Sequence, residues 1–274
     1  MKLAIITPTR NRLYTLSLLH KYIARQTRKP DLWIIATDGE KPNLPDKPVE
    51  TIISLADYAG TPVKSFTGNL MRGINVAEEN GADAVLIMED DDWYASEYVE
   101  QMEELFSTAD VIGNKPTKSI NIVNGAMKEA QHGYFVLAQL GFTRSKNDLF
   151  RASVEQCIKD NTCGVDKKVS ISAKENGARC GALQTPKIYL GMKGIYDIGS
   201  GQAQGLTEQH RRYKKYFKGY IRQLLFLNKS KKDQQEQNVY GKLCQAIGED
   251  DAAAYWNIIS GAKQNQWGNL AEKR

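Results

Sequence analysis

The sequence is poor in the residues that build thiol-based scaffolds. Among 274 residues there are only four cysteines and three histidines, and no two cysteines have Cys-x-x-Cys spacing. These counts argue against a disulfide scaffold and against a structural zinc site. They favour free thiols in a reducing compartment.

Long apolar runs are also absent. The longest, Leu3–Ile6, Val85–Met88 and Phe135–Ala138, are far shorter than the about 18 residues of a membrane span. The N-terminus lacks the charged region, apolar core and cleavage site of a signal peptide. Hydrophobic residues make up 41% and charged residues 25% of the chain, which is typical of globular proteins. We therefore expect a soluble, cytoplasmic protein with one or two domains.

Apolar runs and amphipathic segments alternate in the first 112 residues. Residues 2–6, 32–36 and 84–88 are apolar runs typical of buried strands, whereas residues 13–25 and 67–79 have apolar positions at helical spacing. This alternation predicts a parallel sheet. Farther along, the pattern predicts strands over residues 120–123, 134–140 and 185–191 and helices over residues 147–159 and 167–176.

Polar loops follow three of the predicted strands. They are Thr7–Arg12, Thr37–Gly39 and Glu89–Asp92. Ligands of open parallel sheets bind beyond the carboxyl ends of the strands. We therefore expect the three loops to converge on one binding site.

The third loop consists of four successive carboxylates directly after a buried strand. Like charges at neighbouring positions repel one another and raise pKa values unless a cation is present. Mg²⁺ or Mn²⁺ would relieve this repulsion and leave coordination positions for phosphate oxygens. A solvated acidic turn is the alternative, although such turns rarely follow a fully apolar strand. The loop therefore predicts a divalent metal site.

The three loops together resemble the landmarks of GT-A glycosyltransferases, most closely family 2. The similar stretches are Ile5–Arg12, Ile34–Gly39 and Leu86–Tyr94, in the family's order and spacing. The resemblance covers residues 1–112 well and residues 113–205 loosely. It implies an α/β fold of the GT-A class, which is a Rossmann-like, mixed, mainly parallel sheet flanked by helices, with a helical C-terminal extension.

The same resemblance implies a domain organisation. Residues 1–205 would form the catalytic domain, with a nucleotide-sugar half (1–112) and an acceptor half (113–205). Residues 206–274 would form a basic helical extension.

Site residues also follow from the resemblance. The metal ligands would be Asp91, Glu89 and Asp92, with Glu89 standing where the family has aspartate. The donor-binding residues would be Thr7, Pro8, Thr9, Arg10, Arg12, Asp38, Arg72 and Asp90.

The catalytic base implied by the resemblance is Asp166, which precedes a predicted helix in the acceptor half and would deprotonate the acceptor hydroxyl. A helix N-cap is the alternative role for Asp166. Asp148 and Asp197 are reserve candidates for the base. The segment Gly191–Gly205 contains five glycines and is either a loop that closes over the donor diphosphate or a plain surface turn. His210 is a further candidate diphosphate contact.

A strongly basic segment lies near the C-terminus. Between Glu208 and Asp233, nine basic residues face two acidic ones, a net charge of +7. Arg211, Lys215, Lys218 and Arg222 share one face of the predicted helix. A solvated helix face is the simplest interpretation. A polyanionic partner is the alternative: nucleic acid, narrowly favoured, or an anionic membrane surface.

The sequence therefore predicts a metal-dependent glycosyltransferase. It would use Mn²⁺ or Mg²⁺ and a nucleoside diphosphate sugar, with UDP as the expected nucleotide, and would invert the anomeric centre. The acceptor would be a hydroxylated base in DNA, by analogy with viral DNA-modifying enzymes. Alternatives are a lipid or cell-surface saccharide acceptor at a membrane, a nucleotidyltransferase, and a non-catalytic nucleic-acid-binding protein. The sequence specifies neither the sugar nor the oligomeric state.

Overall fold

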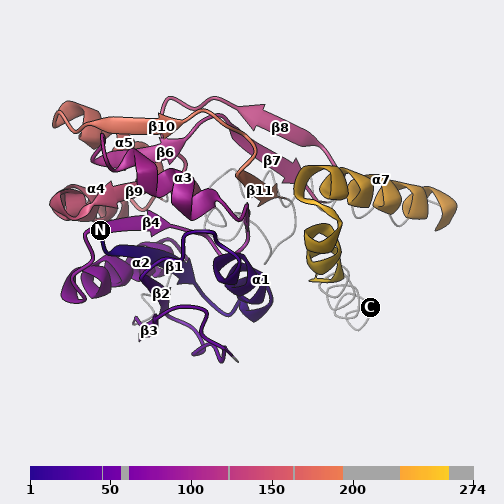
Figure 1. The fold of residues 1–274 in the computed structure, drawn as a ribbon, viewed down its shortest axis with the longest axis horizontal. Helices are drawn as coiled ribbons and strands as arrows, with labels where there is room; N and C mark the ends of the chain where they lie inside the picture. The colour runs from indigo at the N-terminus through magenta and orange to yellow at the C-terminus, as the bar shows by residue number, and fades with distance from the viewer. Residues whose placement is uncertain (45, 57–61, 123, 163, 194–228, 259–274) are drawn as a thin grey trace.

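The inner strands of the protein are apolar on both faces, and this dictates a layered fold. The computed structural model describes residues 1–44, 46–56, 62–122, 124–162, 164–193 and 229–258. Within them, helices cover both faces of a central, mostly parallel sheet (Figure 1), and a helical part lies toward the C-terminus. The expected α/β fold class with a helical C-terminal part is confirmed. The predicted boundary at residue 205 lies outside the described residues.

The strands are β1 (Leu3–Thr9), β2 (Leu32–Thr37), β3 (Thr51–Leu55), β4 (Ala84–Ile87), β5 (Trp93–Tyr94), β6 (Val111–Asn114), β7 (Thr117–Asn121), β8 (Met127–Ala130), β9 (Gly141–Thr143), β10 (Cys180–Leu183) and β11 (Tyr189–Lys193). The helices are α1 (Leu13–Ala24), α2 (Pro62–Glu79), α3 (Tyr98–Leu105), α4 (Asn147–Lys159), α5 (Val165–Glu175) and α7 (Lys229–Ile247), with 3₁₀ turns η1 (Leu137–Gln139) and η2 (Arg144–Lys146). A further helix covers residues 249–258.

The seven-stranded sheet has the order β10-β6-β9-β4-β1-β2-β3. Every neighbouring pair is parallel except those made by β9, which runs antiparallel to both β4 and β6. A smaller sheet has the order β5-β11-β7-β8. Because β1, β2 and β4 are parallel neighbours, their carboxyl ends lie at one edge of the main sheet.

Alternate residues of the central strands enter two separate apolar clusters. In β1, Leu3 and Ile5 belong to the cluster that includes residues of α1, α3 and α7, whereas Ala4 and Ile6 belong to the cluster that includes residues of α2, α4 and α5. This alternation follows from the period of two in a strand. Burial on both faces explains why these strands are continuous apolar runs.

The predicted strand over residues 134–140 is wrong. That segment contains the 3₁₀ turn η1, and the neighbouring strand is the short β9. A short apolar run does not distinguish a strand from another buried conformation. Here Phe135, Leu137 and Leu140 are buried without lying in a strand.

Helix α2 packs closely on β1 at Gly73. A Cβ atom at this position would lie 2.4 Å from Ile6 Cγ2. We expect Gly73→Ala to lower the free energy of unfolding by about 1–3 kcal/mol, because the packed core would have to shift. Gly68→Ala, on the same helix with no atom within 4 Å of the added Cβ, should instead raise it by about 0.5–1 kcal/mol. Urea unfolding tests both, and equal effects would contradict this account of the packing.

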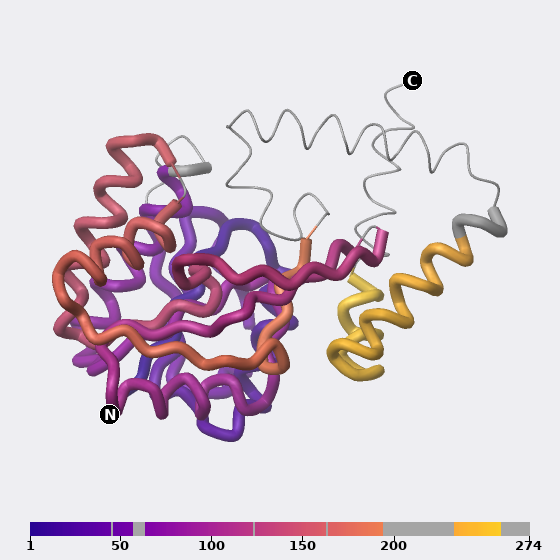
Figure 2. The backbone as a smooth tube through the Cα atoms, turned by 90° about the horizontal axis from the view of Figure 1, so that it is seen from above, coloured from indigo at the N-terminus to yellow at the C-terminus, as the bar shows by residue number. Residues whose placement is uncertain are grey.

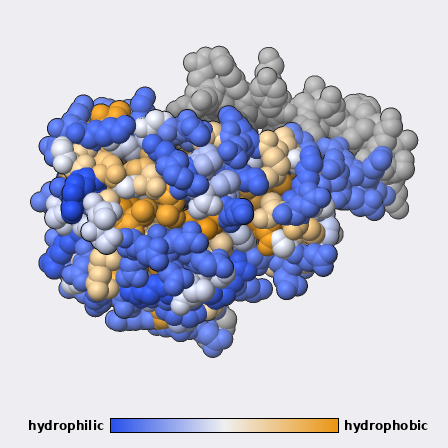
Figure 3. Space-filling model, turned by 45° about the horizontal axis from the view of Figure 1, so that its top comes forward, coloured by the Kyte–Doolittle hydropathy of each residue, from blue (hydrophilic) through white to orange (hydrophobic). Residues whose placement is uncertain are grey.

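The molecular surface is mainly hydrophilic on the face seen in Figure 3, where apolar residues show as a band between hydrophilic ones. Six large hydrophobic residues are exposed in the described ranges: Met1, Leu13, Tyr14, Leu55, Met127 and Ile171. A search of those ranges finds no helix with the length and hydropathy needed to cross a membrane.

Candidate functional site

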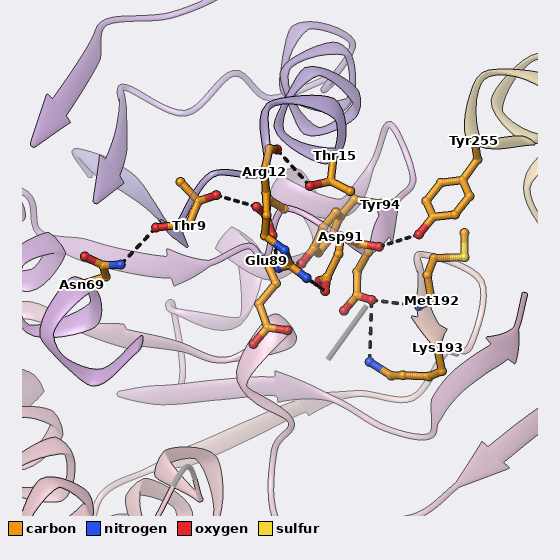
Figure 4. A network of polar contacts seen from close by, with 12 residues as sticks. Thr9, Arg12, Thr15, Asn69, Glu89, Asp91, Tyr94, Met192, Lys193 and Tyr255 are labelled. Carbon is orange, nitrogen blue, oxygen red and sulfur yellow. Dashed lines mark hydrogen bonds and ion pairs between the residues drawn. The ribbon is translucent and has the colours of Figure 1, made fainter. Parts of the chain in front are cut away.

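The loops after β1, β2 and β4 meet at the carboxyl edge of the sheet. Thr9 Oγ1 donates a hydrogen bond to Asp90 Oδ2 at 2.5 Å. From α2, Asn69 Nδ2 donates to the Thr9 carbonyl oxygen and to Asp38 Oδ1, both at 3.0 Å (Figure 4). Side chains from all three predicted loops are therefore in contact, as the sequence predicts.

Arg12 fixes the acidic loop from the start of α1. Its Nη1 lies 2.7 Å from Asp90 Oδ1, and its Nη2 lies 2.8 Å from Asp91 Oδ2. Burial lowers the pKa of Arg12, but the two carboxylates outweigh burial and raise it above its ordinary value. Arg12 therefore stays charged and neutralises part of the loop.

Asp92 is held by β11. Its Oδ2 accepts a hydrogen bond from the Tyr189 hydroxyl, and its Oδ1 accepts one from the Met192 N–H at 2.8 Å. Lys193 Nζ lies 3.8 Å from the same Oδ1. These residues of β11 carry no motif that would reveal the contact in the sequence.

Three carboxylates of the loop have the arrangement of a metal site. Glu89, Asp91 and Asp92 each offer an oxygen, and these oxygens lie within 4.8 Å of one another. Asp91 Oδ1 is buried and has no hydrogen-bond partner among the described residues. A buried carboxylate oxygen without a partner is costly, whereas Mg²⁺ and Mn²⁺ prefer such hard oxygen ligands. The residues therefore fit a divalent cation.

The electrostatics of the loop agree with this fit. Burial raises the pKa of Asp90 to about 6, although Arg12 opposes the shift. Burial, reinforced by Asp91 and Asp92, raises the pKa of Glu89 well above its ordinary value. Burial and mutual repulsion thus disfavour the charged forms of Glu89 and Asp90 even with Arg12 nearby, and an added cation would favour those forms.

The remaining predicted donor residues are distributed along the same edge. The Thr7 hydroxyl accepts a hydrogen bond from Trp33 Nε1 at 3.0 Å inside the sheet, and the neighbouring Pro8 is buried in β1. Arg10 Nε lies 4.0 Å from Asp38 Oδ1. Arg72 is exposed on α2 and donates to Ser54 Oγ on β3 at 2.6 Å. In the structure, Arg72 therefore contacts the edge strand and not the acidic loop.

Two buried polar atoms beside these residues lack partners. They are Asp38 Oδ2 and Asn69 Oδ1, and neither has a hydrogen-bond partner in the described part of the chain. Both are acceptors, so they suit the N–H or O–H groups of a bound ligand. Asn69 was not predicted from the sequence, because a single asparagine within a helical pattern has no distinguishing signature.

Asp166 is the second residue of α5. The N-cap of α5 is Gly164, so the alternative role of Asp166 as an N-cap is wrong. Burial raises the pKa of Asp166, and the hydrogen bond from Lys167 N–H to Asp166 Oδ1, at 2.8 Å, partly opposes that shift.

The segment around the turn η1 connects α5 with the acidic loop. Phe135 N–H, just before η1, donates a hydrogen bond to Ser170 Oγ of α5 at 3.0 Å. The Leu140 carbonyl oxygen, directly after η1, accepts a hydrogen bond from Ile87 N–H at 2.9 Å. The Ala138 carbonyl oxygen accepts one from the Tyr94 hydroxyl at 3.1 Å. A chain of direct contacts therefore leads from α5 to both ends of the metal loop.

Of the two reserve bases, Asp148 has a 98% exposed side chain and pairs with Arg151 at 3.0 Å, so it does not contact the site. Asp197, His210, most of Gly191–Gly205 and the basic residues Arg211, Lys215, Lys218 and Arg222 lie outside the described residues.

Comparisons with known proteins give matches among solved structures alone. No family model matches the chain, and no curated protein matches its sequence. Crystal structures of S. aureus TarS are among the structural neighbours. TarS 1–349 in complex with UDP-GlcNAc matches with a TM-score of 0.47 and 16% identity, over 89% of this chain and 73% of that chain.

Two further TarS structures give the same result. The complex of TarS 1–349 with UDP has a TM-score of 0.47 and 15% identity, over 89% of this chain and 72% of that chain. A longer TarS structure has a TM-score of 0.46 and 15% identity, over 93% of this chain and 50% of that chain. At such scores the likeness concerns general architecture, and the function of this chain has to be argued from its own side chains.

Proposed function

We propose that this protein is a metal-dependent glycosyltransferase that moves a sugar from a nucleoside diphosphate to a hydroxyl acceptor. The observation that carries the proposal is the buried acidic loop. Arg12 and Thr9 hold it in place, and one Asp91 carboxylate oxygen has no hydrogen-bond partner in the part of the chain that the structure describes. The loop lies at the edge of the sheet where α/β enzymes of this class bind their ligands.

The donor nucleotide would bind beside this loop. Asp38 Oδ2 and Asn69 Oδ1, the buried acceptors without partners, would receive hydrogen bonds from the base or the ribose. Arg10, next to Asp38, adds positive charge toward the phosphates. We propose UDP as the nucleotide, on the basis of the family resemblance of the three motifs.

Glu89, Asp91 and Asp92 would hold Mg²⁺ or Mn²⁺. When bound, such an ion offsets the negative charge that develops on the departing diphosphate. The protein's own part is to present the carboxylates in a fixed arrangement, and the contacts of Arg12, Tyr189 and Met192 do this. A fixed arrangement lowers the reorganisation needed at the moment of reaction.

Asp166 would act as the general base. The acceptor oxygen attacks the anomeric carbon, the bond from that carbon to the diphosphate oxygen breaks, and the hydroxyl proton passes to the Asp166 carboxylate. A single displacement of this kind inverts the anomeric centre. The half-buried position of Asp166 and the contacts that link α5 to the acidic loop support this role.

The test is a panel of nucleotide sugars, including UDP-GlcNAc, assayed for release of nucleoside diphosphate with Mn²⁺, with Mg²⁺ and with EDTA. We expect metal-dependent release of UDP. Release of pyrophosphate from a nucleoside triphosphate with a sugar phosphate would instead identify a nucleotidyltransferase. Full activity in EDTA would overturn the metal requirement.

For the acceptor we propose a polyanion, with DNA ahead of a membrane-associated saccharide, in a protein located in the cytoplasm. The support is the sequence alone, since the +7 segment from Glu208 to Asp233 is outside the described residues.

Binding to duplex DNA should weaken steeply between about 50 and 200 mM salt, because contacts with phosphates release counterions. Replacing Arg211, Lys215, Lys218 and Arg222 together by Gln should flatten this dependence and leave donor hydrolysis intact. Anionic vesicles are the comparison: binding to vesicles without binding to DNA would reverse the choice of acceptor.

A further inference from the structure

The helical part near the C-terminus packs against the body of the protein. Val239, Leu243 and Ile247 of α7, together with Ala252 and Tyr255, belong to the same apolar cluster as β1, α1 and α3. Gly248, with φ of +83°, ends α7 and turns the chain. Figures 1 and 2 show α7 and the following helix meeting at an angle at one end of the molecule.

Helix 249–258 contacts the metal loop directly. The Tyr255 hydroxyl donates a hydrogen bond to the Asp91 carbonyl oxygen at 3.0 Å, and Figure 4 shows this side chain reaching the loop from the helix. One turn earlier on the same helix, Asp251 Oδ2 accepts a hydrogen bond from Trp93 Nε1 at 2.6 Å. Residues four apart share one face of a helix, so one face makes both contacts.

Arg25 joins the same contact from the end of α1. Its Nη1 lies 2.6 Å from the Asp251 carboxylate, and its Nη2 donates to the Tyr94 carbonyl oxygen at 2.9 Å. The guanidinium carbon lies 4.8 Å from the ring centroid of Tyr22 and 5.9 Å from that of Trp93. Asp251 thus contacts both Trp93 and Arg25, and Arg25 also binds the Tyr94 carbonyl oxygen. These contacts fix Trp93 and Tyr94, the two residues that directly follow the carboxylates.

Asp91 is consequently fixed from two directions. Arg12 binds its Oδ2, and Tyr255 binds its backbone carbonyl. Among the described residues, Asp91 Oδ1 has no hydrogen-bond partner, and it is the oxygen available to a cation. Tyr255 is 1% exposed and Asp91 is 2% exposed, so water would not readily replace the tyrosine hydroxyl.

We propose that Tyr255 and Asp251 are positioning residues for the metal site, and that helix 249–258 sets the orientation of Asp91. The inference rests on the proposed function in that Asp91 is taken as a metal ligand. Loss of the Tyr255 hydroxyl would leave a buried carbonyl without its partner, and the loop would sample other orientations of Asp91.

Tyr255→Phe tests the proposal, because it removes the hydroxyl and keeps the ring. The affinity of this variant for Mn²⁺, without nucleotide, should be about threefold to tenfold lower than that of the wild-type protein. Electron paramagnetic resonance of the free ion measures this affinity. Amide hydrogen exchange of residues 89–94 in the metal-free protein should become faster.

Tyr240→Phe is the matched control. Tyr240 lies on α7 and packs against Trp256 with ring centroids 5.7 Å apart. Like Tyr255→Phe, this variant removes one tyrosine hydroxyl from the helical part near the C-terminus. We expect wild-type Mn²⁺ affinity and wild-type exchange of residues 89–94. Equal losses in both variants would show a general loss of stability and would overturn the proposal.

Asp251 gives a second, graded test. Asp251→Asn keeps an oxygen for Trp93 Nε1, whereas Asp251→Ala removes it, so the amides of the loop should exchange faster in the alanine variant than in the asparagine variant.

Unchanged amide exchange and unchanged Mn²⁺ affinity in Tyr255→Phe would refute the positioning role. If the wild-type protein bound no Mn²⁺ and hydrolysed no donor, the proposed function would fail, while exchange in the metal-free protein would still decide whether helix 249–258 holds the loop.

Discussion

Asp91→Asn is expected to reduce donor turnover by about 10²-fold or more while the fold remains intact. The amide oxygen can still accept the hydrogen bond from Arg12 Nη2, which lies 2.8 Å from the native Oδ2. The substitution removes the negative charge of the carboxylate. An amide is a weaker ligand for Mn²⁺ or Mg²⁺ than the carboxylate oxygen Oδ1, which has no hydrogen-bond partner among the described residues. Nucleoside diphosphate binding in the presence of Mn²⁺ should weaken in parallel. Steady-state kinetics and calorimetric titration of UDP with and without Mn²⁺ are the measurements.

Asp83→Asn is the control for this variant. Asp83 lies at the opposite end of β4, where its Oδ2 accepts a hydrogen bond from Lys2 N–H at 2.7 Å. The same change of charge there should leave turnover and UDP binding at wild-type levels. Full activity of Asp91→Asn, with unchanged dependence on Mn²⁺, would show that the acidic loop does not bind the metal.

Asp166→Asn should lower turnover by about 10²–10⁴-fold, the range expected for loss of a positioned general base. Donor binding should barely change, because Asp166 lies on α5 and not in the loops proposed to bind the nucleotide. Since burial raises the pKa of Asp166, the carboxylate becomes protonated at a higher pH than an ordinary aspartate. The wild-type kcat/KM should therefore fall on acidification at a pH above the usual aspartate range, and this acid limb should disappear in Asp166→Asn.

Asp148→Asn provides the comparison, because Asp148 is an exposed carboxylate at the start of α4. Its turnover and pH profile should match those of the wild-type protein. A lowered Tm with surviving turnover in Asp166→Asn would indicate a structural role for Asp166, and loss of turnover in Asp148→Asn would redirect the assignment of the base.

The longer helices were predictable from the sequence because they are strongly patterned. Residues 13–25 were predicted to be a helix, and α1 is Leu13–Ala24. Helix α4, Asn147–Lys159, was also predicted. Helix α2 begins at Pro62, five residues before the predicted start at residue 67, since residues 62–66 add few apolar positions to the periodic pattern.

The short strands of the second half were not predictable in the same way. Strands β6, β9 and β10 have four, three and four residues, which is too few for a period of two to be recognised. Their place in the sheet depends on pairing between distant segments: β9 contacts both β4 and β6.

At the site, too, the residues of a local sequence motif were predictable, and the residues that come from distant segments were not. Glu89–Asp92 could be recognised because four carboxylates adjoin one apolar strand. Asn69, Tyr189 and Tyr255 could not, because each reaches the site from another element. Tyr255 contacts a residue 164 positions earlier in the chain, and no local pattern records such a contact.

The position of β9 has a consequence for how donor and acceptor can meet. Strand β6 (Val111–Asn114) spans the proposed boundary between the two halves, and it reaches β4 of the first half through β9, a strand of the second half. The two proposed halves therefore share one continuous sheet. Rigid-body closure of one half onto the other would break the ladder on either side of β9. The distance between the metal loop and Asp166 is thus set by the sheet, and adaptation to substrates of different size falls to loops and side chains.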